Sequence, residues 1–210
     1  MGGTIVVNAE RSQTITKSKL LLVEGPDDHS FFDALLRHLN RQDIEVRSYN
    51  GKDNLRPFLK GLPAFPEFVN VMSLGITRDA DDYADRTFQS ICDSLSNANL
   101  PVPDAPLVLA SGQPQVTVMI IPPGENKGML EDLCLSVLQD DPAMPCVNQY
   151  FDCVENQMGN LPRNMAKAKV HAFLASRERP DLRLGEAALR GYLPWDSSAF
   201  EPVRQFISHL

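Results

Sequence analysis

The feature that most constrains the fold is a short apolar run that ends in an acid. Residues 19–23 read Lys-Leu-Leu-Leu-Val, and Glu24, Gly25 and Pro26 follow them directly. An apolar run of this kind, closed by a turn signal, is typical of a buried strand. The apolar residues over 27–40 then recur at helical spacing. The stretch therefore predicts a strand that brings one carboxylate to the edge of a sheet.

The same alternation of strand and helix patterns continues along the chain. Residues 107–110 and 116–121 predict either a hairpin or two strands with an excursion between them. Strands that alternate with helices predict βαβ units and a mostly parallel sheet of about four to five strands. The remaining expected strands cover residues 4–7, 44–49 and 68–76, and the remaining expected helices cover residues 52–61, 82–97 and 128–139.

Length and composition indicate an ordinary globular α/β protein. The chain has 210 residues, of which 43% are hydrophobic and 22% are charged, enough to bury a full core. We expect an α/β core over residues 1–140 and a helical C-terminal extension over residues 141–210 that packs on the core, with Trp195 as a packing anchor. No apolar run is long enough to span a membrane, and the N-terminus lacks a signal-peptide pattern, so the expected location is cytoplasmic.

Net charge and cysteine spacing restrict how the chain could bind nucleic acid and metal. The net charge of −7 argues against a uniformly basic surface that grips nucleic acid. Residues 163–190 nevertheless carry seven Lys/Arg against three acids, so one local face could meet phosphate. The four cysteines form no CxxC pair, which favours reduced thiols over disulfides or a zinc site.

Acidic residues follow three of the predicted strands. Glu24 ends the first run, Asp79 and Asp81 follow residues 68–76, and Glu131 opens the helix after 116–121. One Asp-x-Asp after a strand is often a turn or a helix cap. Carboxyl ends of parallel strands, however, converge on one crevice, and clustered carboxylates repel one another unless a cation lies between them. All-oxygen ligands select Mg²⁺ or Mn²⁺, and residues two apart on an extended chain, such as Asp79 and Asp81, can share an ion.

These residues resemble a known family. The sequence Leu-Val-Glu-Gly-Pro-Asp-Asp over 22–28, followed later by Asp79-Ala80-Asp81, is similar to the Toprim domain of topoisomerases, primases, recombination proteins and OLD-type nucleases. The run Gly-Met-Leu-Glu-Asp over 128–132 is similar to a pattern of small stand-alone bacterial Toprim proteins. The resemblance covers about residues 19–135 and implies a Toprim-like, Rossmannoid fold.

The resemblance implies a role for each acid. Glu24 would be the strand-one general acid/base or a metal ligand, and Asp79 and Asp81 the metal-binding pair. Asp28 and Glu131 fall where OLD-type nucleases have further ligands, which would permit two metal ions. The chain has no evident nucleophilic tyrosine module, so strand passage is not expected.

Basic residues complete the expected site. A phosphodiester held by metal ions needs cationic side chains on the scissile phosphate, with water as the nucleophile. Lys52 follows the second strand, and Lys167 and Lys169 lie in the basic segment near the C-terminus. We therefore assign phosphate binding to these three lysines, and a catalytic role to Glu24, Lys167 and Lys169.

Three functions are compatible with this pattern. The first is Mg²⁺-dependent hydrolysis of DNA or RNA, by the monomer or by a homodimer that pools basic helices. The second is a non-catalytic Toprim module that binds metal, nucleotide or a partner protein, an alternative that the acidic net charge favours. The third is phosphotransfer with Asp79 as the nucleophile.

Overall fold

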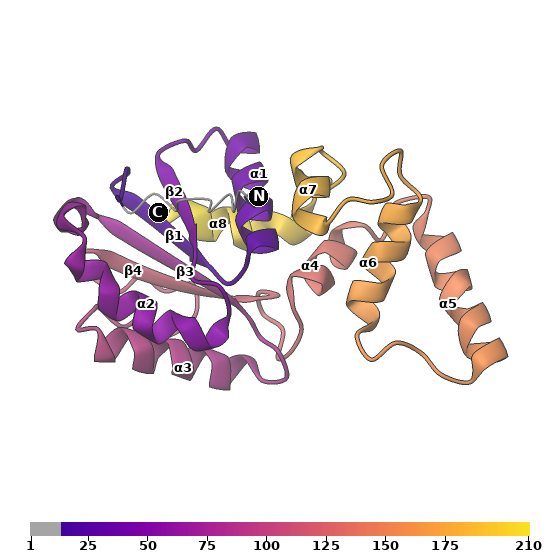
Figure 1. Cartoon of the computed structure of the whole chain (residues 1–210), viewed down its shortest axis with the longest axis horizontal. Helices are drawn as coiled ribbons and strands as arrows, with labels where there is room; N and C mark the ends of the chain where they lie inside the picture. Colours follow the sequence, from indigo (N-terminus) through magenta and orange to yellow (C-terminus); the bar gives the residue numbers. More distant parts are fainter. Residues whose placement is uncertain (1–13) are drawn as a thin grey trace, which may run out of the picture.

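The computed structural model describes residues 14–210, so the strand expected over residues 4–7 lies outside the described part. The described chain is an α/β protein with a parallel sheet, as the sequence predicts (Figure 1). Its helices are α1 (Pro26–His38), α2 (Leu55–Gly61), α3 (Ala84–Asn97), α4 (Leu130–Val137), α5 (Met144–Met158), α6 (Met165–Ala175), α7 (Leu184–Leu189) and α8 (Glu201–Ser208).

Four parallel strands form the sheet in the order β2-β1-β3-β4. In the register of β1 with β3, Leu22 lies beside Ile76. Every connection between neighbouring strands carries at least one helix, as parallel strands require. The carboxyl ends of all strands therefore lie at one edge of the sheet. The strands are β1 (Lys19–Val23), β2 (Ile44–Ser48), β3 (Ser73–Asp79) and β4 (Gln115–Ile121).

Helices cover both faces of the sheet (Figure 1). Alternate residues of β1 point to opposite faces, so Leu21 and Leu22 belong to different hydrophobic clusters. Leu22 packs in the cluster that includes residues of α2 and α3. Leu21 packs in the larger cluster, with residues of α1, α4, α7 and α8. Both faces of β1 are therefore buried, which explains its continuous apolar run.

The C-terminal helix α8 lies against the sheet itself. Phe206 and Leu210 approach Gly75 so closely that a Cβ atom at Gly75 would lie about 3 Å from each. The Ser73 hydroxyl donates a hydrogen bond of 3.1 Å to the Leu210 carbonyl oxygen. The last residues of the chain thus fill the face of β3 on the α1 side.

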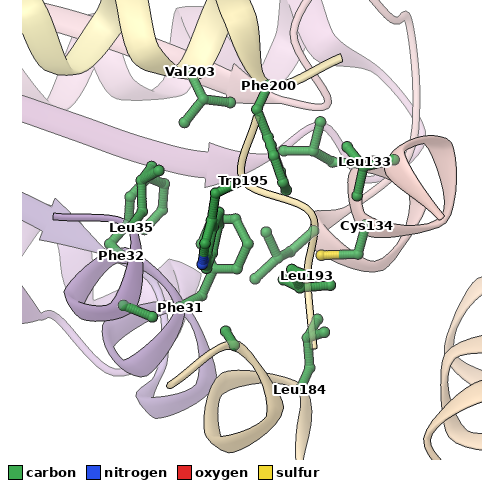
Figure 2. Close-up of a cluster of buried hydrophobic side chains, with 14 of the residues drawn as sticks. Phe31, Phe32, Leu35, Leu133, Cys134, Leu184, Leu193, Trp195, Phe200 and Val203 are labelled. Carbon is green, nitrogen blue, oxygen red and sulfur yellow. The ribbon is translucent and has the colours of Figure 1, made fainter. Parts of the chain in front are cut away.

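Aromatic side chains join the C-terminal segment to α1 (Figure 2). The Trp195 ring lies 5.2 Å from both the Phe31 and the Phe200 ring centroids, and all three side chains are buried. Trp195 is thus a packing anchor, as predicted. Offset and edge-to-face aromatic contacts of this kind add roughly 0.5–1.5 kcal/mol beyond the buried area.

Two expected strands differ from the structure. Residues 66–70 form a 3₁₀ helix, and β3 begins only at Ser73. Pro66 sets the helical φ at its start, and pairing begins where the Met72 N–H reaches the Ser18 carbonyl, at 2.7 Å. Residues 107–110 make only an isolated antiparallel bridge, between Ala110 and Val116, so the hairpin alternative describes this edge better than a full strand.

We expect Gly185→Ala to destabilise the protein because α7 packs directly on α1. A Cβ atom at Gly185 would lie 2.6 Å from the Asp27 carbonyl oxygen and 2.5 Å from Ser30 Cβ. Overpacking of this kind costs roughly 1–3 kcal/mol. Urea unfolding followed by circular dichroism should show a lower midpoint than wild type.

The matched control is Gly61→Ala at the last residue of α2. Nothing lies within 4 Å of a Cβ atom there, and the φ is not left-handed. This variant should be neutral or more stable by up to about 1 kcal/mol. Equal midpoints for the two variants would contradict the close approach of α7 to α1.

Candidate functional site

Glu24 is held at the end of β1 by the turn that follows β2. Its carbonyl oxygen accepts hydrogen bonds from the Gly51 N–H at 2.9 Å and from the Ser48 hydroxyl at 3.1 Å. Gly51 adopts a left-handed φ of 98°, which glycine accommodates without strain. The Asn50-Gly51 turn therefore fixes the backbone from which the Glu24 carboxylate projects.

Arg78 is a neighbour of Glu24 that the sequence analysis missed. Extending the register beyond Leu22 and Ile76 by two residues puts Glu24 beside Arg78, on the same face of the sheet. The Arg78 Nε lies 3.9 Å from a Glu24 carboxylate oxygen, and only 11% of the arginine side chain is exposed. The Nε is buried without a hydrogen-bond partner. An arginine directly before Asp79, at the end of a predicted strand, was the available signal.

A second group of acids forms where β3 meets α1 and α4. Asp79 accepts a hydrogen bond of 3.0 Å from the Leu130 N–H in the first turn of α4. Asp28 accepts one of 3.0 Å from the Gly25 N–H at the start of α1. Glu131, in the first turn of α4, adds a charge that acts on both carboxylates. Helix N-termini favour such negative charge.

Burial and mutual repulsion shift the pKa values of these acids. Burial, followed by the charges of Asp28, Glu24 and Glu131, raises the pKa of Asp79 to about 8. Burial also raises the pKa of Asp28 to about 6. For Glu24, burial raises the pKa and the Arg78 guanidinium opposes the increase. The acids thus lie close enough to disfavour each other's ionisation.

Asp81 belongs with Glu24 rather than with Asp79. Strand β3 ends at Asp79, and Asp81 adopts a left-handed φ of 52°, so the two-residue period of an extended chain does not apply. The Asp81 backbone pairs with Gly128. Its carboxylate lies 3.7 Å from Lys52 Nζ, and its charge acts on Glu24. The acids therefore form two adjacent groups, Glu24 with Asp81 and Asp28 with Asp79 and Glu131.

Two of the three predicted lysines lie beside the acidic groups, and the third does not. Lys52 pairs with Asp81, and Lys167 Nζ lies 3.7 Å from Glu131 Oε1, so both contact the acidic groups. Lys169 instead donates a hydrogen bond of 2.8 Å to Asn148 of α5. Lys169 lines a separate pocket with Asn148, and it does not line the groove that Asp81 lines.

A groove beside the acids carries further basic residues. Its volume is about 770 Å³, and it runs between the loop after β4 and the start of α6. Asp81 lines it together with Lys127 and Arg163, two cationic residues that were not assigned from the sequence. Lys127 lies in the proline- and glycine-rich turn after β4. A lysine in a turn at a strand end was a sequence signal for a phosphate-binding residue.

The donor atoms fit a hard divalent cation, although no complete cage is formed. Carboxylate oxygens are the ligands that Mg²⁺ and Mn²⁺ prefer. Within residues 14–210, no three His, Cys, Asp or Glu side chains are arranged so that together they could hold a metal ion. Mg²⁺ is often held by only one or two carboxylates, with water and substrate oxygens filling its other positions. The two acidic groups satisfy that smaller requirement.

The fold and the position of these carboxylates define an α/β protein with an acidic site at the carboxyl ends of a parallel sheet. The chain belongs to the family described as "Protein of unknown function (DUF3226)", whose model matches residues 18–210. No curated protein matches the sequence. Across residues 14–210, none of the helices combines the length and apolar character needed to cross a membrane.

Solved structures of low sequence identity are similar to this chain. One is the C-terminal region of the OLD protein of Xanthomonas campestris pv. campestris, phased with mercury. It is 16% identical, with a TM-score of 0.48 and coverage of 93% of this chain and 95% of that chain. Another is the C-terminal region of the Burkholderia pseudomallei OLD protein, at 13% identity and a TM-score of 0.46, with 93% and 97% covered. A likeness of this degree carries no information on activity.

We expect Asp79→Asn to stabilise the protein in EDTA. The carboxamide oxygen can still accept the Leu130 N–H, but the side chain cannot ionise among the other acids. The pKa of Asp79 is about 8 in the folded protein and about 4 when unfolded. Wild type therefore loses stability as the pH rises from about 4 to 8. The gain in unfolding free energy should grow over this range, amount to several kcal/mol and level off above about pH 8.

Urea unfolding of both proteins between pH 5 and pH 9 measures this gain. Asp104→Asn, in the exposed loop after α3, is the control and should follow wild type at every pH. A variant less stable than wild type throughout would show that Asp79 is not destabilised by its neighbours.

Proposed function

We propose that this protein carries out Mg²⁺-dependent chemistry on nucleic-acid phosphodiester bonds, most simply hydrolysis. The observation that carries the proposal is the convergence of five carboxylates from β1, β3, α1 and α4 at one edge of the sheet, each within reach of another acid or a basic side chain. The Toprim resemblance of residues 19–135 supports it. The five are Glu24, Asp28, Asp79, Asp81 and Glu131.

The two acidic groups suit two cations. Glu24 and Asp81 would contribute carboxylate oxygens to one, and one or two acids of the group formed by Asp28, Asp79 and Glu131 to the other, with water and substrate oxygens filling the remaining positions. Bound there, the ions would polarise a phosphodiester and lower the pKa of attacking water. The protein's own contribution is to hold the carboxylates on rigid strand ends and helix N-termini. Arg78 limits the rise in the Glu24 pKa that burial causes, which helps Glu24 to serve as a proton acceptor or ligand.

Basic side chains around the acids supply contacts for phosphate. Lys52 and Lys167 are more than half exposed while they pair with Asp81 and Glu131, so each can turn to a substrate phosphate. Lys127 and Arg163 add two cations to the groove, which Asp81, Glu125 and Asp132 also line. A local cluster of cations can bind nucleic acid although the net charge of the chain is −7.

One observation favours the second candidate, a non-catalytic module that binds metal, nucleotide or a partner protein. The net charge of −7 is unfavourable for a protein that must hold a nucleic-acid substrate by itself. Such a module would bind Mg²⁺ weakly through its carboxylates without turning over nucleic acid.

Cleavage assays test the first candidate. Wild type should nick plasmid DNA, or degrade single-stranded DNA or RNA, with Mg²⁺ or Mn²⁺, and EDTA should abolish the activity. Glu24→Gln and Asp81→Asn should each lower the rate at least about 100-fold, because each removes a ligand or proton acceptor. Both substitutions keep the size of the side chain.

The controls are Glu178→Gln, in the exposed loop before α7, and Asp104→Asn, in the loop after α3. Both should retain wild-type rates. Cleavage that survives Glu24→Gln and Asp81→Asn would remove these carboxylates from the reaction. Metal binding without cleavage of any substrate would favour the second candidate.

Metal binding gives a prediction that does not depend on turnover. Mg²⁺ or Mn²⁺ should raise the unfolding free energy of wild type by about 2.7 kcal/mol at 100 times Kd, because the ions relieve repulsion among the carboxylates. Asp79→Asn should gain much less. The variant would then exceed wild type in stability in EDTA and lose that advantage in Mg²⁺. Thermal unfolding with and without the metal ion measures this difference. If the ion stabilised wild type and Asp79→Asn equally, Asp79 would be excluded as a ligand.

A further inference from the structure

Tyr83 is a large aromatic side chain exposed beside the acidic site. It follows Asp81 and Asp82 directly and precedes the first residue of α3. Its exposed fraction is 58%, one of the highest among the aromatic side chains of residues 14–210. Its side chain makes no capping hydrogen bond to α3. Helix formation therefore does not account for an aromatic ring at this position.

Arg86 lies across the Tyr83 ring. The guanidinium carbon is 4.3 Å from the ring centroid, and the two residues are three apart, the spacing of neighbours on a helix surface. A cation over a ring at an exposed site contributes roughly 0.5–1 kcal/mol. The contact orients the ring while more than half of the tyrosine surface stays open to solvent.

Helix α3, which carries Arg86, also contacts Arg78, the neighbour of Glu24. Arg86 and Ser90 are four apart and share a face of α3. The Ser90 hydroxyl accepts a hydrogen bond of 3.4 Å from Arg78 Nη1, and Arg78 Nε lies 3.9 Å from Glu24. The pair thus follows Asp81 by two residues and lies at the start of the helix that contacts Arg78.

We propose that Tyr83 and Arg86 form a stacking platform for one unpaired nucleobase next to the scissile phosphate, so that the substrate class is single-stranded nucleic acid. The inference rests on the proposed function and specifies its substrate. A base in a duplex is already stacked on both faces, whereas an unpaired base can stack on the open face of the ring. Base–aromatic stacking contributes about 1–3 kcal/mol and tolerates any base. The Arg86 charge offers a contact for the adjacent phosphate.

Fluorescence anisotropy with labelled single-stranded DNA, single-stranded RNA and duplex DNA tests the platform. Ca²⁺ replaces Mg²⁺ so that binding is measured without cleavage. Tyr83→Ala should weaken single-strand binding about 5- to 150-fold, the equivalent of 1–3 kcal/mol of stacking. Tyr83→Phe should bind within about twofold of wild type, because it keeps the ring. Binding to duplex should not change.

Tyr150 provides a matched control. It is a tyrosine on α5 with an exposed fraction of 57%, on the helix farthest from the sheet in Figure 1. Tyr150→Ala should bind all three ligands as wild type does. Wild-type binding by Tyr83→Ala, or an equal loss with Tyr150→Ala, would overturn the platform. An equal loss on duplex and single strand would overturn its preference for unpaired bases.

The cleavage assay separates this inference from the proposed function. If wild type cleaves nucleic acid and Tyr83→Ala binds single strands normally, the platform is wrong and the proposed activity stands. If Tyr83 is needed for single-strand binding but wild type cleaves nothing, the platform stands and hydrolysis is wrong. If wild type binds none of the three ligands, both are wrong.

Discussion

The parallel pairing of β1 with β3 is the constraint on which the site depends. Each strand is an apolar run that ends in charged residues, and the register with Leu22 beside Ile76 brings Glu24 next to Arg78 at one edge. Asp79 then follows on the opposite face of the sheet, where α1 and α4 begin. The hydrophobic burial that aligns the strands therefore also forces like charges together. Part of the stability of the fold offsets that repulsion, which a cation bound between the acids would relieve.

The repulsion is reduced in different ways on the two faces. On the α2–α3 side, Arg78 and Lys52 lie close to Glu24 and Asp81, so these acids have cationic neighbours. On the α1–α4 side, Asp79 and its neighbours accept hydrogen bonds from backbone N–H groups at helix starts, and burial raises the pKa of Asp79 to about 8. A divalent ion would stabilise the second group more, because burial and mutual repulsion already disfavour the ionised forms of Asp28 and Asp79.

The C-terminal segment supports the same edge of the sheet. Leu210 fills the space over Gly75 in β3, and Trp195 packs on Phe31 of α1, the helix that begins directly after Glu24. Helix α7 approaches α1 so closely that only glycine fits at position 185. Helix α6 carries Lys167 to Glu131. The scaffold of the acidic site therefore includes residues far from it in the sequence, and substitutions in the last helices can disturb the strand ends.

The sequence by itself determined the α/β class, the parallel sheet, most helices and the strand-end location of the acids, because apolar periodicity and turn residues are local properties. It predicted a strand over 68–76 where a proline-initiated 3₁₀ helix comes first, since β propensity does not show where a pairing partner begins. Tertiary structure alone decided that Asp81 turns toward Lys52, that Arg78 lies against Glu24, and that Lys169 faces α5. These outcomes depend on strand register, on one left-handed residue and on helix packing, which join residues distant in the chain.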